Sequence, residues 1–94
     1  MASKRELKKD IDYLVGEVIS DCYTYMLING EKKRDDAIAI IESILEKRNE
    51  LIHRIKHPAK KDDSKAVKEH YREIQKDALK AIDESFSKLS ELTK

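Results

Sequence analysis

The chain has 94 residues, of which 39% are hydrophobic and 41% are charged, and its net charge is +1. This length suits one domain with a modest core, and the near-neutral charge provides no global field that would select a partner. Two glycines and one proline are too few for an all-β fold, which needs a turn about every 10 residues. We therefore expect an all-α fold in a single domain that spans residues 1–94.

Cellular location is the second property that the sequence constrains. No apolar stretch approaches the roughly 20 residues that cross a bilayer, and the first residues carry no apolar segment typical of a secretory signal. The single cysteine, Cys22, cannot form an internal disulfide, which favours a reducing compartment. These features predict a cytoplasmic protein without a membrane partner.

A capping-box pattern opens the first predicted helix, which spans about residues 4–28. Ser3 is followed by Glu6, and in such a pair each side chain accepts a hydrogen bond from a backbone N–H of the other residue. Hydrophobic residues then recur every three or four positions and form one stripe along a helix. The stripe comprises Leu7, Ile11, Leu14, Val15, Val18, Cys22, Tyr25 and Met26. Asn29 and Gly30 follow, and glycine is favoured where a helix ends in a left-handed turn.

The second predicted helix spans about residues 36–56. Asp35 or Asp36 can cap its N-terminus, and both carboxylates favour the positive end of the helix dipole. Its expected inner face comprises Ile38, Ile41, Ile44, Leu45, Ile52 and Ile55. The helix should end at His57, because the proline that follows disfavours helical backbone in the residue before it.

The third predicted helix spans about residues 65–92 and follows a polar connection over residues 59–63. Asp63 or Ser64 can cap it. Its hydrophobic stripe comprises Val67, Tyr71, Ile74, Ala78, Ala81, Ile82, Phe86, Leu89 and Leu92. Short connections favour antiparallel neighbours, so we predict an up-down-up three-helix antiparallel bundle with long helices. Because the second helix is the shortest, the ends of the other two should project beyond it or be covered by another subunit.

The first helix has more apolar surface than one core requires. Opposite its core stripe lies a second set of residues: Tyr13, Gly16, Ser20, Tyr23 and Leu27. Small residues one turn apart let another backbone come close, and tyrosine combines apolar area with a polar tip suited to contact surfaces. We interpret this face as a homodimer interface with two-fold symmetry. The alternative is that the first helix is central in the bundle and that the tyrosines lie on its rim.

The opening of the first helix also carries a resemblance. The segment Lys8-Lys9-Asp10-Ile11-Asp12-Tyr13-Leu14-Val15-Gly16-Glu17 and the tyrosine-containing stretch after it resemble an uncharacterised family of small all-helical proteins from Bacteroidetes-type bacteria. The resemblance covers about the first third of the chain. It implies a cytosolic bacterial protein and carries over no catalytic or binding residues.

Charge is sorted along the chain. Residues 1–10 carry four basic and two acidic side chains, residues 47–70 carry eight and four, and residues 17–46 carry three and seven. In an up-down-up bundle the first two segments share one end, which we call the basic pole. Its candidate anion-binding residues are Arg5, Lys8, Lys9, Arg54, Lys56, Lys60 and Lys61. This pole could bind nucleic acid or another anion, although lysine-rich helix ends also simply keep a small bundle soluble.

All three histidines belong to the same pole. His53 and His57 are one helical turn apart, a spacing that can hold a transition metal, whereas the predicted buried face turns His53 outward.

The remaining candidate for chemistry is the thiol. Cys22 lies in the hydrophobic stripe, where a thiol acts as a small apolar group. No residue pattern places a base beside a nucleophile. We therefore expect a non-enzymatic interaction or structural protein without a cofactor, most simply a homodimer. Nucleic-acid or anion binding and metal binding are the alternatives, and an unidentified protein partner is possible.

Overall fold

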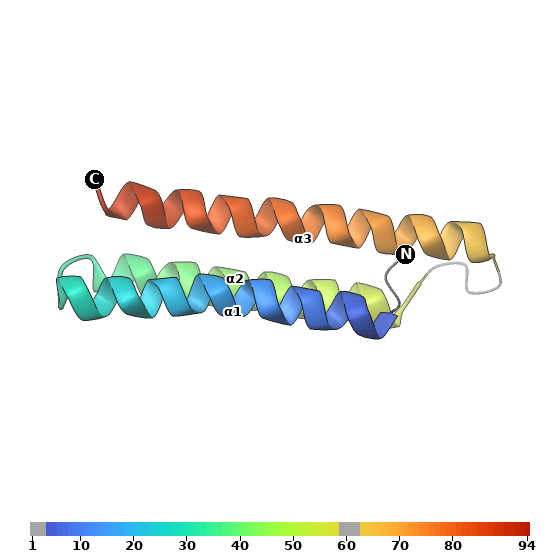
Figure 1. Cartoon of the computed structure of the whole chain (residues 1–94), viewed down its shortest axis with the longest axis horizontal. Coiled ribbons are helices and arrows are strands. Elements are labelled where there is room, and N and C mark those ends of the chain that lie inside the picture. The colour runs from blue at the N-terminus through green and yellow to red at the C-terminus, as the bar shows by residue number, and fades with distance from the viewer. Residues whose placement is uncertain (1–3, 59–62) are drawn as a thin grey trace.

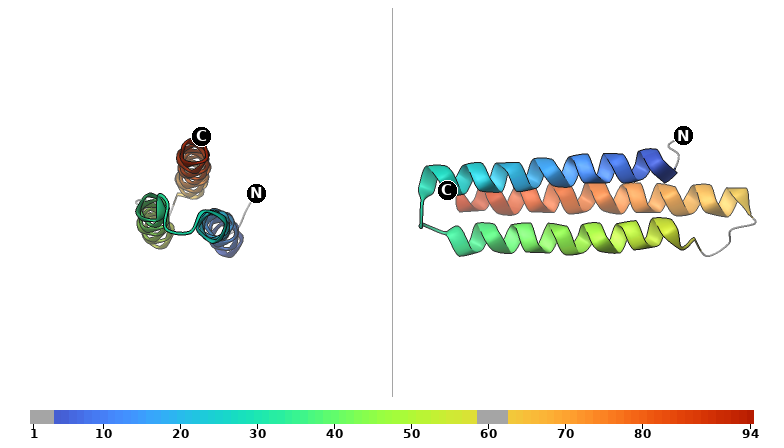
Figure 2. Two further views of the ribbon diagram at one scale, coloured as in Figure 1. Left: turned by 90° about the vertical axis from the view of Figure 1, so that its left-hand side faces the viewer. Right: turned by 90° about the horizontal axis from the view of Figure 1, so that it is seen from below.

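Three long helices make up the structure. The computed structural model describes residues 4–58 and 63–94, with α1 at Lys4–Asn29, α2 at Arg34–Lys56 and α3 at Ser64–Leu92. Successive helices run in opposite directions, and all three pack against one another (Figure 1). Viewed along the long axis they occupy the corners of a triangle (Figure 2). The predicted all-α, up-down-up bundle is confirmed, and its extents are 51 × 19 × 18 Å.

The end of α1 and the end of α2 follow the sequence signals. Gly30 adopts a left-handed φ of 62°, and its N–H donates to the carbonyl of Met26 over 2.8 Å, which closes α1. His57 caps α2 directly before Pro58. The proposed Ser3 cap of α1 lies outside the described residues.

The start of α2 differs from the prediction. The helix begins two residues earlier, at Arg34, and its N-cap is Lys33 in the left-handed conformation, with φ 57° and no side-chain capping hydrogen bond. Asp35 and Asp36 therefore do not cap the helix. They lie in its first turn, where a carboxylate still interacts favourably with the helix dipole.

The start of α3 confirms the sequence signal. Asp63 is the N-cap, and one of its carboxylate oxygens accepts hydrogen bonds from the backbone N–H groups of Lys65 and Ala66. At this end α3 extends past both other helices (Figure 1). The first buried side chain of α3 is Ile74, ten residues after its start.

One hydrophobic core runs along the bundle axis. It is formed by Leu7, Ile11, Val15, Val18, Cys22, Tyr25, Ala37, Ile40, Ile44, Leu51, Ile52, Ile55, Ile74, Ala78, Ala81, Ile82 and Leu89. The expected inner face of α2 was partly wrong. Leu45 is 41% exposed, and Ile38 and Ile41 are only partly buried, because α2 is rotated so that Ala37, Ile40 and Leu51 face the other helices. No helix among the described residues is long and apolar enough to span a membrane.

The end of the bundle opposite the basic pole is closed by polar contacts. The hydroxyl of Tyr25 donates to the carbonyl of Leu92 over 3.2 Å, and the ammonium group of Lys33 donates to the same carbonyl over 3.3 Å. These bonds satisfy a carbonyl in the last turn of α3 that has no partner within its own helix. They fix the end of α3 against α1 and against the connection to α2.

Candidate interaction surface

The five residues that sequence analysis assigned to an interface lie together on the outward face of α1. Tyr13 is 66% exposed, Tyr23 is 56% exposed and Leu27 is 86% exposed, while Gly16 and Ser20 between them are exposed as well. We call this set, Tyr13, Gly16, Ser20, Tyr23 and Leu27, the outer seam. Most of it faces away from both neighbouring helices, since α1 occupies one corner of the triangle rather than its centre, while Tyr13 borders the groove toward α3 (Figure 2).

The spacing of the outer seam is that of a helix-packing stripe. Its members follow one another at intervals of three, four, three and four residues, which is the repeat of helices that cross at about 20°. The buried face of α1 has similar spacing on the opposite side of the helix. α1 therefore presents two apolar stripes, and the described parts of α2 and α3 cover only one of them.

Gly16 has no packing role within its own chain. A Cβ atom placed on it would meet nothing within 4 Å, and its backbone does not have the positive φ that would require glycine. Glycine inside a helix costs about 0.5–1 kcal/mol relative to alanine. The chain tolerates this cost at the middle of the outer seam, where a small residue allows a second helix to approach closely.

Further apolar side chains extend the exposed surface beside the seam. Ile28 is 77% exposed beside Leu27, and Leu79 of α3 is 49% exposed. Leu79 lines a groove of about 190 Å³ between α1 and α3, together with Tyr13 and the partly buried Leu14. Sequence analysis missed Leu79, although its position outside the stripe of α3 was a usable signal.

An ion pair borders the seam on the side of α2. Nε of Arg48 donates to the carboxylate of Asp12 over 2.8 Å, and this hydrogen bond raises the pKa of Arg48. Both side chains remain solvated, so the pair adds little to stability. The ion pair holds Asp12 toward α2, so the carboxylate of Asp12 does not cover the tyrosines of the outer seam.

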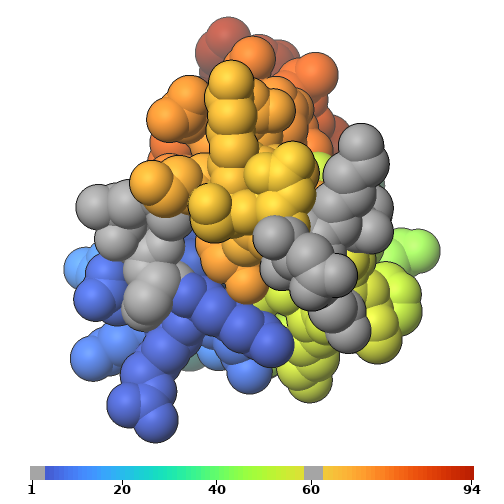
Figure 3. Space-filling view, turned by 90° about the vertical axis from the view of Figure 1, so that its right-hand side faces the viewer, coloured from blue at the N-terminus to red at the C-terminus, as the bar shows by residue number. Residues whose placement is uncertain are grey.

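Of the residues assigned to the basic pole, five lie in the described part of the chain, and one of these is engaged in an ion pair. The start of α1, which carries Arg5, Lys8 and Lys9, and the end of α2, which carries Lys56, lie at the same end of the bundle, which faces the viewer in Figure 3. Arg54 instead donates to the carboxylate of Asp77 on α3 over 2.8 Å. That hydrogen bond lowers the pKa of Asp77, with the nearby charges of Arg54, Lys47 and Lys80 acting in the same direction. Lys60 and Lys61 lie outside the described residues.

The histidines separate into a pair and a single residue. The rings of His53 and His57 lie side by side with their centroids 4.4 Å apart, and both side chains are exposed. His70 makes a different contact, since its Nε2 lies 2.6 Å from the carbonyl oxygen of Arg54 in the last turn of α2. The described residues contain no cluster of three or more potential metal ligands, so the pair has no third protein ligand there.

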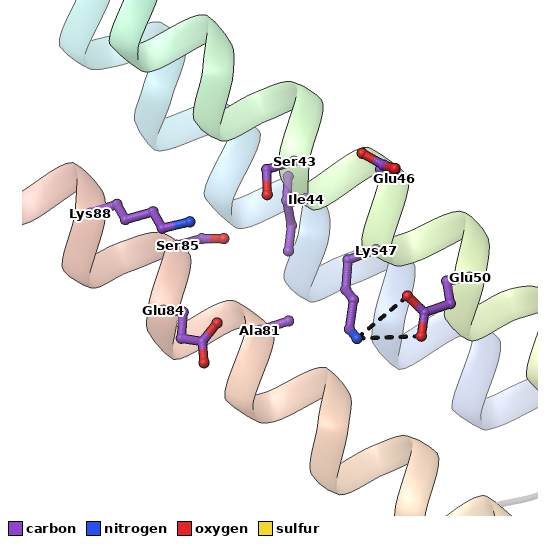
Figure 4. Close-up of a pocket in the computed structure, with 9 residues that line it drawn as sticks. All are labelled: Ser43, Ile44, Glu46, Lys47, Glu50, Ala81, Glu84, Ser85 and Lys88. Carbon is purple, nitrogen blue, oxygen red and sulfur yellow. Dashed lines mark hydrogen bonds and ion pairs between the residues drawn. The ribbon is translucent and has the colours of Figure 1, made fainter.

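The groove between α2 and α3 has a different character. It has a volume of about 270 Å³ and is lined by Ser43, Ile44, Glu46, Lys47, Glu50, Ala81, Glu84, Ser85 and Lys88. Figure 4 shows Lys47 reaching toward Glu50, 3.4 Å away, with Ser85 and Lys88 on the facing helix. The lining charges are of both signs, and no histidine or cysteine is among them. This pattern is that of a solvated ion-pair face between two helices.

The single thiol is buried away from every groove described above. Cys22 is fully buried in the core, and this burial, followed by the nearby charge of Asp21, raises its pKa. A raised pKa lowers the fraction of reactive thiolate. Cys22 therefore contributes to packing as a small apolar side chain.

The fold and its surfaces define a three-helix bundle whose first helix carries an uncovered second apolar face. No protein-family model, curated protein or solved structure matches the chain. The resemblance of residues 8–17 to a bacterial helical family stays a prediction. Among the surfaces described above, the outer seam is the one that packing of the three helices does not require.

Proposed function

We propose that this protein is a non-enzymatic interaction protein that associates with a second copy of itself through the outer seam of α1. The observation that carries the proposal is the exposed stripe in which Gly16 and Ser20 lie between Tyr13 and Tyr23. Aromatic residues are enriched at protein interfaces, and small residues between them permit close helix contact. The buried free thiol of Cys22 supports a place in the reducing cytoplasm.

The exposed side chains also set the expected strength of association. In a symmetric pair Tyr13, Tyr23 and Leu27 would each be buried twice, and each burial contributes about 1–2 kcal/mol. This gain must exceed an association cost of about 4–15 kcal/mol. Six such burials leave a net gain of at most about 8 kcal/mol, so we expect a dissociation constant no tighter than the micromolar range.

Sedimentation equilibrium of the wild type and of Gly16→Arg tests this proposal. The wild type should shift from monomer to dimer between about 1 μM and about 1 mM, whereas Gly16→Arg should stay monomeric because its side chain blocks the close approach. Arginine is a better helix former than glycine by about 0.8 kcal/mol, so Gly16→Arg should unfold in urea at a concentration no lower than wild type.

Ser87→Arg is the matched control, since Ser87 is an exposed small residue on the outward face of α3. It should dimerise as the wild type does. A wild type that sediments as a monomer over the whole range, or a Gly16→Arg variant that dimerises as well as wild type, would contradict the proposal.

A further inference from the structure

The outer seam has nearly the same chemistry when it is followed from either end. Tyr13 and Gly16 are three residues apart, Gly16 and Ser20 are four apart, and Ser20 and Tyr23 are three apart. Val18 is the midpoint of this arrangement, on the buried side of α1. A two-fold rotation that reverses the direction of α1 about the level of Val18 therefore exchanges Tyr13 with Tyr23 and Gly16 with Ser20.

We infer that the second copy binds in antiparallel orientation, with a two-fold axis at the level of Val18, so that Tyr13 packs against the other copy's Tyr23. This inference rests on the proposed function. Its geometry puts Gly16 and Ser20 at the point where the two α1 helices approach most closely, and it places the tyrosines on either side of that point. Alternating spacings of three and four allow the two helices to cross at about 20° and remain in contact along the seam.

Charge favours the antiparallel orientation over the parallel one. Lys9 lies four residues before Tyr13 on the same face, so parallel helices would place two Lys9 ammonium groups side by side. Antiparallel helices instead place Lys9 beside Leu27, which its aliphatic stem can cover.

The charge of Asp12 does not decide the orientation, because Arg48 pairs with it on the side of α2. Antiparallel α1 helices also align their dipoles favourably.

Two single-cysteine variants distinguish the orientations. Tyr13→Cys and Tyr23→Cys are purified separately, oxidised alone and as an equimolar mixture, and analysed on non-reducing gels. In an antiparallel dimer the mixture should form a covalent dimer while each variant alone should not. Positions 13 and 13 of the two copies are then about 15 Å apart along the axis at 1.5 Å per residue, too far for a disulfide. A mixed dimer keeps one tyrosine pair intact, and oxidised wild type controls for the buried Cys22.

Each outcome has a defined meaning. A covalent dimer in the mixture alone supports the antiparallel seam. Cross-linking of Tyr13→Cys or Tyr23→Cys with itself overturns the inference in favour of a parallel dimer and leaves the proposed function standing. Absence of cross-linking in every sample also overturns it, and sedimentation of the wild type then shows whether a dimer forms by another surface or whether the proposed function fails too.

Discussion

The outward faces of α1 and α3 differ, although both helices pack against the same core. α3 presents Lys76, Lys80, Asp83 and Ser87 to solvent, all of them exposed. α1 presents Tyr13, Tyr23 and Leu27 at equivalent outward positions. Folding of a bundle requires one apolar stripe on each helix, and α3 has that pattern. The second stripe of α1 exceeds what packing of the three described helices requires, which is why we propose that a second copy covers it.

Truncating one residue on each face of α1 gives the largest difference. Ile11→Ala removes a side chain that is 2% exposed in the core, and it should lower the free energy of unfolding by about 2–5 kcal/mol. Leu27→Ala should change it by less than about 0.5 kcal/mol, because Leu27 contacts little within the monomer. Urea unfolding at a concentration where both variants are monomeric measures both values. Equal losses would mean that the outer seam stabilises the monomer.

The reactivity of one thiol on each face of α1 compares the burial of the two faces without truncating a large side chain. Cys22 on the inner face should react with an aromatic disulfide reagent at least about 100 times more slowly than a cysteine introduced by Ser20→Cys on the outer seam, because burial and a raised pKa both protect it. The Ser20→Cys protein contains both thiols, so one time course reports both rates. Urea above the unfolding midpoint should make the rates equal. Rapid reaction of Cys22 in the folded protein would show that the core at α1 opens easily.

Alanine substitution of the two glycines should change the free energy of unfolding by smaller amounts and in opposite directions. Gly16→Ala should stabilise the monomer by about 0.5–1 kcal/mol, because the added methyl group enters open space in a regular helix. Gly30→Ala should destabilise it by about 1 kcal/mol, because Gly30 has a φ of +62° that alanine adopts with strain. Thermal or urea unfolding of the monomers checks both signs. Destabilisation by Gly16→Ala would point to an intrachain role for that glycine.

The smallest effect concerns the ion pair between α2 and α3. Its contribution to stability should depend on pH, whereas that of the outer seam should not. The hydrogen bond from Arg54 lowers the pKa of Asp77 below its usual value of about 3.9, so the carboxylate stays charged in the folded chain at a pH where the unfolded chain binds a proton. The stabilisation is complete above the unfolded-state pKa and is lost as the pH falls through the folded-state pKa.

Asp77→Asn should remove this dependence. The wild type should lose about 0.2–1 kcal/mol more stability than Asp77→Asn on acidification from about pH 5 to about pH 2, a small value because both side chains are solvated. Arg54→Gln should show the same reduced loss, and combining the two substitutions should add nothing further. Urea midpoints across the pH range test this, and an unchanged pH profile in both variants would contradict it.

The sequence predicted the helices well because their signals are local. Gly30, the His57-Pro58 pair and Asp63 act within a few residues, and their effects are the same in any helical protein. The start of α2 was placed less well, since a left-handed Lys33 depends on how the connection from α1 closes rather than on a capping side chain. The positions of the outer seam were also predictable, because they follow directly from the phase of the core stripe of α1.

The rotation of α2 about its axis and the partner of Arg54 could not be predicted from local sequence signals. α2 has isoleucine or leucine on several sides, so its own periodicity does not decide whether Leu45 or Ile40 faces inward. That choice depends on the sizes of the side chains that α1 and α3 present to it. Arg54 meets Asp77 because of the antiparallel register of α2 and α3, which is a property of the pair of helices and not of either sequence alone.

The beginning of α3, which extends past α1 and α2, should be the first part of the bundle to unfold. Before Ile74 the side chains of α3 are exposed or only partly buried, and an isolated helical segment of this length is only marginally stable in water. Its winding depends on the carboxylate of Asp63 and on the contact of His70 with the carbonyl of Arg54. Amide protons of residues 67–70 should therefore exchange with solvent first, with the exchange front advancing toward Leu92, so that α3 frays from its beginning while its final turn stays wound.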